Sequence, residues 1–212
     1  MTHFKIDIVS DTVCPWCYVG HRRLSKAISQ HQLQNPTDTF SITWKPYYLD
    51  PTAPKEGENK FERYQRKFSG QAEALLDRMT QTGKLDGINF KWGGKTGNTR
   101  DSHRLIELGK QKGGNTQTRV VEELFAAYFE NEKDITSHAV LQEAAVKAGL
   151  DEAEVKDWLS SDKGGKEVDH EVRQAQLRGI SGVPNFTINQ KYVVGGAQEA
   201  DAFLELFKET KE

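Results

Sequence analysis

Two cysteines stand close together near the start of the chain, in the sequence Cys14-Pro15-Trp16-Cys17, and the chain contains no other cysteine. With two residues between them, the thiols can close into a small disulfide ring. Reversible dithiol–disulfide exchange is therefore the first chemistry that these residues indicate. The thiolate is the reactive form of cysteine, and the start of a helix favours it through the macrodipole and the unpaired N–H groups.

The segments on either side of the pair predict such a position. Apolar residues alternate over positions 4–9, as in a strand with one buried face. Apolar residues after Cys17 recur at helical spacing, and no helix breaker follows before Pro36. The sequence therefore predicts a strand-to-helix junction, with the first cysteine at or near the helix N-terminus.

A metal site and an inert buried pair are the alternatives for the two cysteines. Cys14, Cys17 and His21 have a spacing that could coordinate zinc, but zinc needs about four ligands and the sequence shows no fourth. His21 also falls on the predicted helix, which leads away from the pair. The strand-to-helix context favours a redox pair, and no metal site is predicted.

The chain as a whole limits the classes of function. Its 212 residues suffice for one large domain, or for a small domain with a substantial insertion. The net charge of −2 does not suggest a nucleic-acid partner, and no apolar run approaches the roughly 20 residues that span a membrane. Met1 leads directly into a strand pattern, so no cleaved signal is expected. Two cysteines within one motif fit a reducing compartment, and a cytoplasmic location is expected.

A change of pattern divides the chain into two parts. A second strand is predicted at 40–44, and helical spacing then begins near Phe61 and continues for over a hundred residues. Strand patterns return at 185–188 and 192–194 around a turn at Asn189-Gln190, before a final helix. The predicted order is βαβ, a block of helices, then ββα. The fold class is therefore α/β, with residues 1–58 and 177–212 forming a discontinuous domain and residues 59–176 an all-helical insertion domain.

The elements of the helical block and of the chain end are predicted from periodicity and helix breakers. Helices are expected at 61–82, 99–112, 116–131, 137–148, 165–178 and 197–208, with a short helix after Asp151. Asp151 and Glu154 resemble a capping box, and the tail from Lys208 to Glu212 is expected to fray. The glycine-rich segment 83–98 is predicted to be a loop. Its Gly93-Gly94-Lys95-Thr96 sequence is not a phosphate-binding loop, because Asn89 occupies the position of the first glycine.

Separated motifs in this chain resemble a known superfamily. The Cys14-Pro15-Trp16-Cys17 motif, with Gly182-Val183-Pro184 before a hairpin, resembles the thioredoxin superfamily, and the helical insertion resembles the DsbA-like oxidoreductases. Further segments are similar to the FrnE-like branch of that group: Asp11 to Gly20, Asn98-Thr99, His103-Arg104, Gly179 to Pro184 and Gly195 to Gln198. The resemblance spans nearly the full chain.

The resemblance implies a thioredoxin fold with a large helical insertion and assigns roles at its dithiol. Cys14 is then the attacking thiolate, exposed at the helix start, and Cys17 is the resolving thiol that closes the disulfide. The Val183–Pro184 bond is expected to be cis and to face the cysteines. The backbone of Val183 is expected to bind an extended substrate segment as an added strand would.

Further residues are expected around this dithiol. Pro15 suits the first turn of a helix, and Trp16 is expected to cover the thiolate and to offer substrates an apolar surface. Asp11 and His103 are candidates for lining the active site. Asp11 is more simply read as a turn or cap residue, although its carboxylate could accept a proton from Cys17. It does not match the buried acid of thioredoxin, which lies further back in the strand.

The function predicted from these residues is thiol–disulfide exchange, as a disulfide reductase, isomerase or oxidase. An alternative is a glutathione-dependent isomerase or transferase of the 2-hydroxychromene-2-carboxylate isomerase or kappa type. The resemblance implies that such enzymes carry a serine at the position of Cys14, so the intact cysteine pair argues against this alternative. A non-enzymatic binding protein is the third hypothesis. The expected partners are disulfide-containing proteins or small thiols. No bound cofactor is predicted, glutathione is a candidate electron donor, and the protein is expected to be a monomer or a homodimer.

Overall fold

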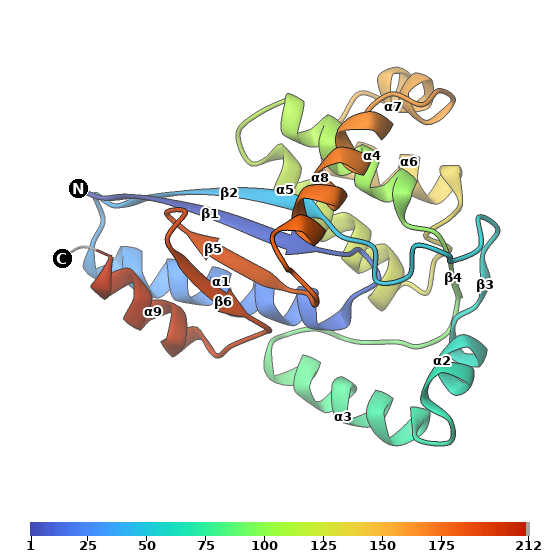
Figure 1. Cartoon of the computed structure of the whole chain (residues 1–212), viewed down its shortest axis with the longest axis horizontal. Coiled ribbons are helices and arrows are strands. Elements are labelled where there is room, and N and C mark those ends of the chain that lie inside the picture. Colours follow the sequence, from blue (N-terminus) through green and yellow to red (C-terminus); the bar gives the residue numbers. More distant parts are fainter. Residues whose placement is uncertain (211–212) are drawn as a thin grey trace.

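The computed structural model describes residues 1–210. Its centre is a four-stranded sheet in the order β2-β1-β5-β6, formed by β1 (His3–Ser10), β2 (Thr39–Pro46), β5 (Asn185–Ile188) and β6 (Tyr192–Gly195) (Figure 1). β1 is parallel to β2 and antiparallel to β5, and β5 forms an antiparallel hairpin with β6. The predicted α/β order of βαβ followed by ββα is confirmed.

One face of the sheet is covered by two helices. α1 (Pro15–Gln34) and α9 (Ala200–Glu209) lie side by side against it (Figure 1). Alternate residues of β1, Phe4, Ile6 and Ile8, are buried in this core together with Phe207 of α9. Burial of each such side chain contributes about 1.5–3 kcal/mol to the stability of the fold. This packing therefore holds β1 in a fixed orientation at the point where it leads into α1.

The β5–β6 connection, Asn189 to Lys191, contains the turn that the sequence predicts. Asn189 and Gln190 adopt positive φ values of 50° and 58°, as a type I′ turn requires at both central positions. The Asn189 side chain also accepts a hydrogen bond from the Lys5 N–H at 2.8 Å. The turn is thereby fixed against the neighbouring strand β1.

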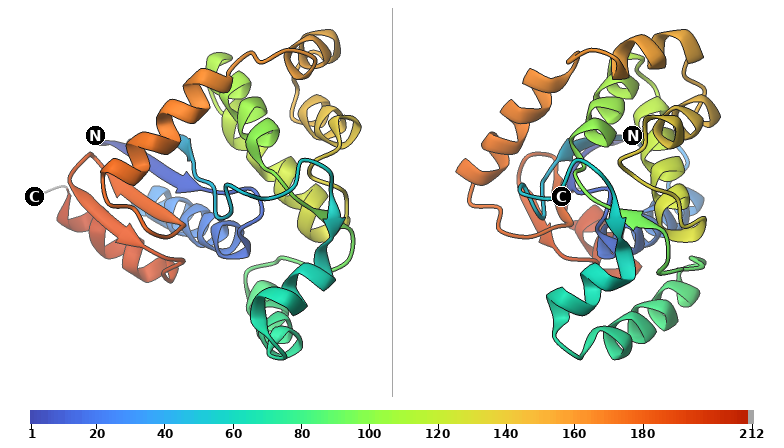
Figure 2. Two further views of the ribbon diagram at one scale, coloured as in Figure 1. Left: turned by 45° about the vertical axis from the view of Figure 1, so that its right-hand side comes forward. Right: turned by 90° about the vertical axis from the view of Figure 1, so that its right-hand side faces the viewer.

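Every helix between β2 and β5 belongs to the insertion, which extends to the right of the sheet in Figure 1 and is seen from two further sides in Figure 2. Its elements are β3 (Glu58–Asn59), α2 (Lys60–Phe68), α3 (Ala72–Leu85), β4 (Lys95–Thr96), α4 (Arg100–Gln111), α5 (Thr116–Phe125), the π-helical turn η1 (Ala126–Glu130), α6 (His138–Lys147), α7 (Glu152–Leu159) and α8 (Gly165–Leu177). α4, α5 and α8 pack against β2. The domain boundaries at 58/59 and 176/177 stay predictions.

The structure corrects two predictions at the start of the insertion. The helix predicted at 61–82 is two helices, because Ser69 and Gly70 between α2 and α3 adopt positive φ values of 39° and 82°. The segment 83–98 is only partly a loop. α3 continues through Leu85, and β4 pairs with β3 in a second, two-stranded sheet.

The helix predicted at 116–131 is α-helical only as far as Phe125. From Ala126 to Glu130 it continues as the π-helical turn η1. A π-helical turn departs from the usual α-helical bonding pattern. Two of its carbonyl oxygens accept from outside the helix: that of Tyr128 from the Lys60 ammonium and that of Phe129 from the Lys91 N–H, both at 2.7 Å. These bonds tie the π-helical turn to the segments before and after α3.

The start of α7 and the end of the chain show local agreement with the sequence. Asp151 accepts a hydrogen bond from the Glu154 N–H at 2.9 Å, which confirms one half of the predicted capping box. The Glu154 carboxylate instead pairs with Lys112 at 2.7 Å. α9 continues through Glu209, so the start of the expected frayed tail is helical, and 211–212 lie outside the described residues. Among residues 1–210, no helix is long and apolar enough to cross a bilayer.

Lys60 is a buried cation in the insertion. Besides its bond to the Tyr128 carbonyl, its Nζ lies 4.2 Å from the centroid of the Tyr128 ring. The side chain has no exposed surface, and burial lowers the pKa of Lys60 from 10.5 to about 8. The folded chain therefore releases this proton at a lower pH than the unfolded chain does.

We expect this difference to appear in the pH dependence of stability. Between pH 8 and 10.5 the unfolded chain binds more protons at Lys60 than the folded chain, so stability rises with pH in this window. The gain approaches about 3 kcal/mol, because each pKa unit is worth about 1.36 kcal/mol. Urea unfolding of the wild type and of Lys60→Met at several pH values measures it as the difference between the two proteins. A difference that stays constant from pH 7.5 to 10 would contradict the prediction.

Candidate active site

The two cysteines lie at the junction of β1 and α1. The turn Asp11 to Cys14 connects the strand to the helix and is closed by a hydrogen bond from the Cys14 N–H to the Asp11 carbonyl at 3.0 Å. Cys14 is the N-cap residue of α1, and Pro15 begins the helix, where its missing N–H removes no helical bond. Cys17 follows one turn later, with its N–H donating to the Cys14 carbonyl at 3.1 Å.

Both cysteines are free thiols, and both are buried. Cys17 has no exposed surface, and Cys14 is only 4% exposed, which corrects the expectation of an exposed Cys14. The reason is the loop before β5, which lies over the helix start: the Cys14 thiol donates to the Val183 carbonyl at 3.6 Å.

The two thiols differ in their electrostatic environment. Burial is the main reason that the pKa of Cys17 lies well above its usual value, and the hydrogen bond and charge of Cys14 raise it further. Cys17 is thus held as a neutral thiol at neutral pH, one helical turn below Cys14.

The Val183–Pro184 peptide bond is cis, and this loop packs closely on α1. Gly20 makes the close approach feasible, because a Cβ at this position would lie 2.9 Å from the Phe186 ring and 3.2 Å from Pro184. Trp16 points outward and is 43% exposed, which leaves an apolar surface beside the helix start. The Val183 carbonyl thus contacts the Cys14 thiol, and the exposed Trp16 ring lies two residues further along the same helix start.

Asp11 and His103 come together, although 92 residues separate them in the chain. The Asp11 carboxylate is 1% exposed, and its Oδ1 lies 3.3 Å from the His103 Nε2. Its Oδ2 accepts from the Leu49 N–H at 2.8 Å. His103 Nε2 is also 3.1 Å from the Tyr47 carbonyl oxygen, so this nitrogen carries a proton and donates. The pair joins the turn before Cys14 to α4 and to the segment after β2.

A cavity of about 60 Å³ adjoins this turn on the side of the insertion. Such a volume can hold a few water molecules. Residues from the turn, from the segments after β2 and β4, from α2 and from η1 line it, including Asp11, Val13, Arg63, Tyr64, Thr96 and Tyr128. Burial raises the pKa of Tyr64 to about 12, and the charge of Cys14 adds to the rise.

Sequence reasoning did not find Tyr64, Thr96 or Tyr128. Tyr64 and Tyr128 lie in segments whose helical periodicity is explained by packing alone, and Thr96 lies in the segment predicted to be a loop. The Tyr128 hydroxyl and the Thr96 hydroxyl are 2.8 Å apart, which joins η1 to β4. No sequence pattern predicts this contact.

A groove of about 970 Å³ borders the cis-proline loop on the other side. It lies on the sheet face opposite α1, and Asp7, Val9, Thr187 and Val193 contribute to its floor while residues 178–184 form a wall. Val193 is 65% exposed there. An extended segment that passes Val183 has room to continue along this groove.

Two sequence candidates lie elsewhere. His21 is on α1 but packs against Trp44, and its Nε2 lies 2.8 Å from Glu122 of α5, so it does not join the cysteines in a ligand set. Among residues 1–210, no cluster of three or more metal-ligating side chains occurs. Gly93 and Gly94 lie against Glu132, where their lack of a side chain permits the contact.

The fold and this junction define a class of protein: a thioredoxin fold with a dithiol at the start of its first helix and a cis-proline loop against it. Comparison with known families gives the same result for residues 5–208, which match the model of the DSBA-like thioredoxin domain. The chain belongs to this family, which confirms the fold class and the resemblance predicted from the sequence.

Individual relatives agree over nearly the whole chain. The uncharacterized protein YwbO of Bacillus subtilis (strain 168) is 27% identical over 209 residues, covering 93% of this chain and 92% of its own length. The structure of a probable DsbA oxidoreductase from Streptomyces coelicolor has a TM-score of 0.87 and 28% identity, covering 98% of this chain and 89% of its own. The cytosolic disulfide reductase DsbM from Pseudomonas aeruginosa, solved with GSH, has a TM-score of 0.63 and 15% identity, covering 97% and 99%.

Proposed function

We propose that this protein is a thiol–disulfide oxidoreductase in which Cys14 attacks and Cys17 resolves. The observation that carries the proposal is the pair of free thiols at the start of α1, with the Cys14 sulfur against the Val183 carbonyl. The raised pKa of Cys17 supports its role, because a neutral thiol does not compete with Cys14 for the substrate. Membership of the DSBA-like family supports the same chemistry.

The exchange has two steps. The Cys14 thiolate attacks one sulfur of a substrate disulfide, which forms a mixed disulfide and releases a substrate thiolate that takes a proton from water. Cys17 then loses its proton to water and attacks the Cys14 sulfur, which releases the second substrate thiolate and leaves a Cys14–Cys17 disulfide. Two electrons pass from the dithiol to the substrate disulfide. In the opposite direction, the same steps oxidise a substrate dithiol.

Disulfide-containing proteins and small disulfides are the proposed substrates. The groove beside Val183 supports the first class, because an extended segment has room there. Reduced glutathione is the proposed electron donor: two molecules reduce the Cys14–Cys17 disulfide and leave as glutathione disulfide. A cytoplasmic location is part of the proposal, and the confinement of both cysteines to one motif supports it.

The proposal is tested by equilibrating the wild type and Cys14→Ser in graded mixtures of reduced and oxidised glutathione. Free thiols are alkylated and counted by mass. We expect one two-electron transition in the wild type, in which both cysteines become protected together, and no internal disulfide in the variant. If both wild-type thiols are still alkylated in strongly oxidising buffer, the proposed function is wrong.

A further inference from the structure

We infer that the groove beside the cis-proline loop selects protein substrates that carry a lysine or arginine near the reacting cysteine, and that Asp7 on the groove floor binds this cation. Asp7 takes no part in bond formation and acts as a specificity-determining residue. The inference rests on the proposed function. It adds a class of substrate to that function, namely basic extended segments of disulfide-containing proteins.

The groove begins at the residue that covers the reacting sulfur. Val183 lines its wall, and the Val183 carbonyl accepts a hydrogen bond from the Cys14 thiol. The same wall contains Gly179 and Gly182, and a Cβ at either position would meet no other atom within 4 Å. The wall is thus open where the groove starts, so an extended chain that binds beside Val183 can enter it.

The floor of the groove is the outer face of the sheet. Side chains alternate between the two faces along a strand, so Asp7 points away from the core that contains Ile6 and Ile8. Asp7 is half-buried, and it lies directly opposite Thr187 in the pairing of β1 with β5. The Asp7 carboxylate is therefore on the opposite side of the sheet from α1 and serves the groove.

The Asp7 carboxylate has no cation beside it. Within residues 1–210, it is the one acidic side chain that lines the groove, and it forms no ion pair or side-chain hydrogen bond. Lys45 is held by Glu171 at 3.1 Å, and Arg178 is exposed at the C-cap of α8, where its charge complements the helix carbonyls. Because a partly buried charge without a partner is unfavourable, a cation from a ligand would be bound here.

The position of Asp7 specifies where the substrate should carry its cation. The substrate cysteine must lie beside Val183, because its sulfur bonds to Cys14. Thr187, which faces Asp7, is four residues further along the chain than Val183, a distance of about 13 Å at the rise of an extended strand. An extended segment that follows the groove therefore brings its fourth residue from the cysteine to Asp7.

The inference is tested in Cys17→Ser, which retains the mixed disulfide, with symmetrical disulfides of short single-cysteine peptides. Cys14 attacks one sulfur, and the other peptide leaves as its thiol. The peptides carry lysine, glutamine or glutamate four residues before or after the cysteine. Mass spectrometry measures the initial rate of adduct formation, which is divided by the rate of the same peptide with free glutathione to correct for intrinsic reactivity.

We expect lysine on one side of the cysteine to give a rate about tenfold higher than glutamine at low salt, and the difference to shrink at high salt. Equal rates for all peptides overturn the inference, and so does a glutamate peptide that reacts faster than the lysine peptide. The side on which lysine acts gives the direction in which the segment runs along the groove.

Asp7→Asn in the same background removes the charge and keeps the shape. The lysine and glutamine peptides should then react within twofold of each other. Glutathione disulfide should form its adduct at an unchanged rate, because a tripeptide at Cys14 does not extend to Asp7. Asp201→Asn is the matched control: Asp201 is exposed on α9, on the other side of the sheet, and the preference for lysine should remain. A lysine preference that persists in Asp7→Asn overturns the inference.

A second variant covers the case in which Asp7→Asn does not fold. Thr187→Lys places an ammonium group directly opposite Asp7, with the two Cβ atoms about 4.5–5.5 Å apart, and should also abolish the preference for lysine. An undiminished preference in this variant overturns the inference. Failure of the proposed function gives a different result, in which neither the peptide disulfides nor glutathione disulfide form an adduct with Cys14.

Discussion

A Cys17→Ser variant should complete the first step of the exchange and stop there, retaining one substrate molecule on Cys14. The serine hydroxyl cannot attack the Cys14 sulfur, so the mixed disulfide persists when no other thiol is supplied. Turnover should fall to the uncatalysed background. Mass spectrometry without reductant measures the trapped adduct, which dithiothreitol should release.

Cys14→Ser is the control for this experiment. It should form no adduct, because the thiol that remains, Cys17, is fully buried and its pKa is raised. The assigned roles are reversed if Cys14→Ser traps substrate and Cys17→Ser does not. They are wrong altogether if both variants turn over at the wild-type rate.

Replacement of Arg104 by methionine should lower the free energy of unfolding by about 3 kcal/mol, because it takes the donor from the carbonyls of Ser161 and Lys163 and the charge partner from Asp101. The guanidinium is buried, and it donates to the carbonyls of Trp158, Ser161 and Lys163. It also pairs with Asp101 at 2.7 Å. α4 is thereby joined to the end of α7 and the segment before α8. Urea unfolding followed by circular dichroism measures the change.

Arg100→Met is the matched control for Arg104→Met. Arg100 lies one turn earlier on α4 and pairs with Asp162 and Asp169 in the same region of the insertion, but it is partly exposed. Exposed ion pairs contribute at most about 1 kcal/mol, so its loss should cost about that much or less. Equal destabilisation by the two variants would contradict the prediction that the hydrogen bonds of the buried guanidinium are responsible.

The fold could be predicted largely because its signals are local. The alternation over residues 4–9, the turn at Asn189-Gln190 and the apolar periodicity after Cys17 each depend on a few neighbouring residues. The errors also have local causes. Ser69 and Gly70 take positive φ values that end a helix whose apolar spacing continues, and η1 changes the hydrogen bonds of a helix without changing its composition.

Only the site residues that belong to a recognisable sequence motif could be predicted. The cysteines and the Val183-Pro184 loop come from such motifs. The burial of Cys14 does not, because it depends on a contact between residues 169 positions apart. The pairing of Asp11 with His103 depends in the same way on the docking of α4. Tyr64 and Tyr128 line the cavity beside Asp11 and Val13 from helices whose apolar spacing indicates only core packing.

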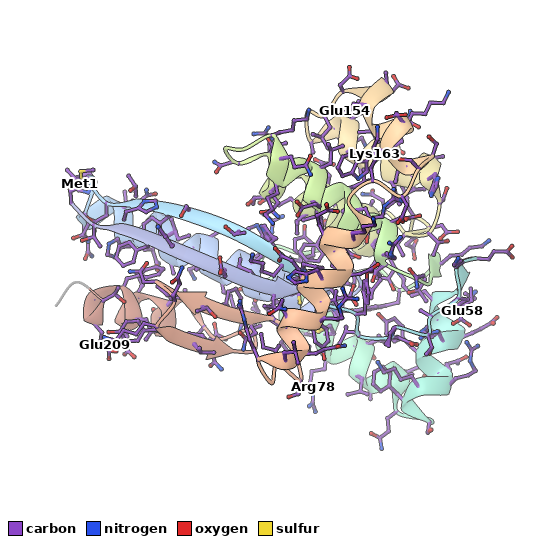
Figure 3. The ribbon with its side chains drawn as sticks, turned by 45° about the horizontal axis from the view of Figure 1, so that its top comes forward. Met1, Glu58, Arg78, Glu154, Lys163 and Glu209 are labelled. Atoms are coloured by element: carbon purple, nitrogen blue, oxygen red, sulfur yellow. The ribbon has the colours of Figure 1, made fainter. Side chains whose placement is uncertain are left out.

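The position of β5 in the sequence has a consequence for biosynthesis. β1 can pair with β2 soon after it is made, but Ile6 meets its other partner, Ile188, only when almost the whole chain exists. At about 5–20 residues per second, translation takes on the order of ten seconds or more to cover that interval. Met1 and Glu209 lie at the same end of the molecule in Figure 3, and α9, which ends at Glu209, packs against α1 only after this late step. A nascent chain therefore lacks the Val183 carbonyl that covers the Cys14 thiol until its last strands are made.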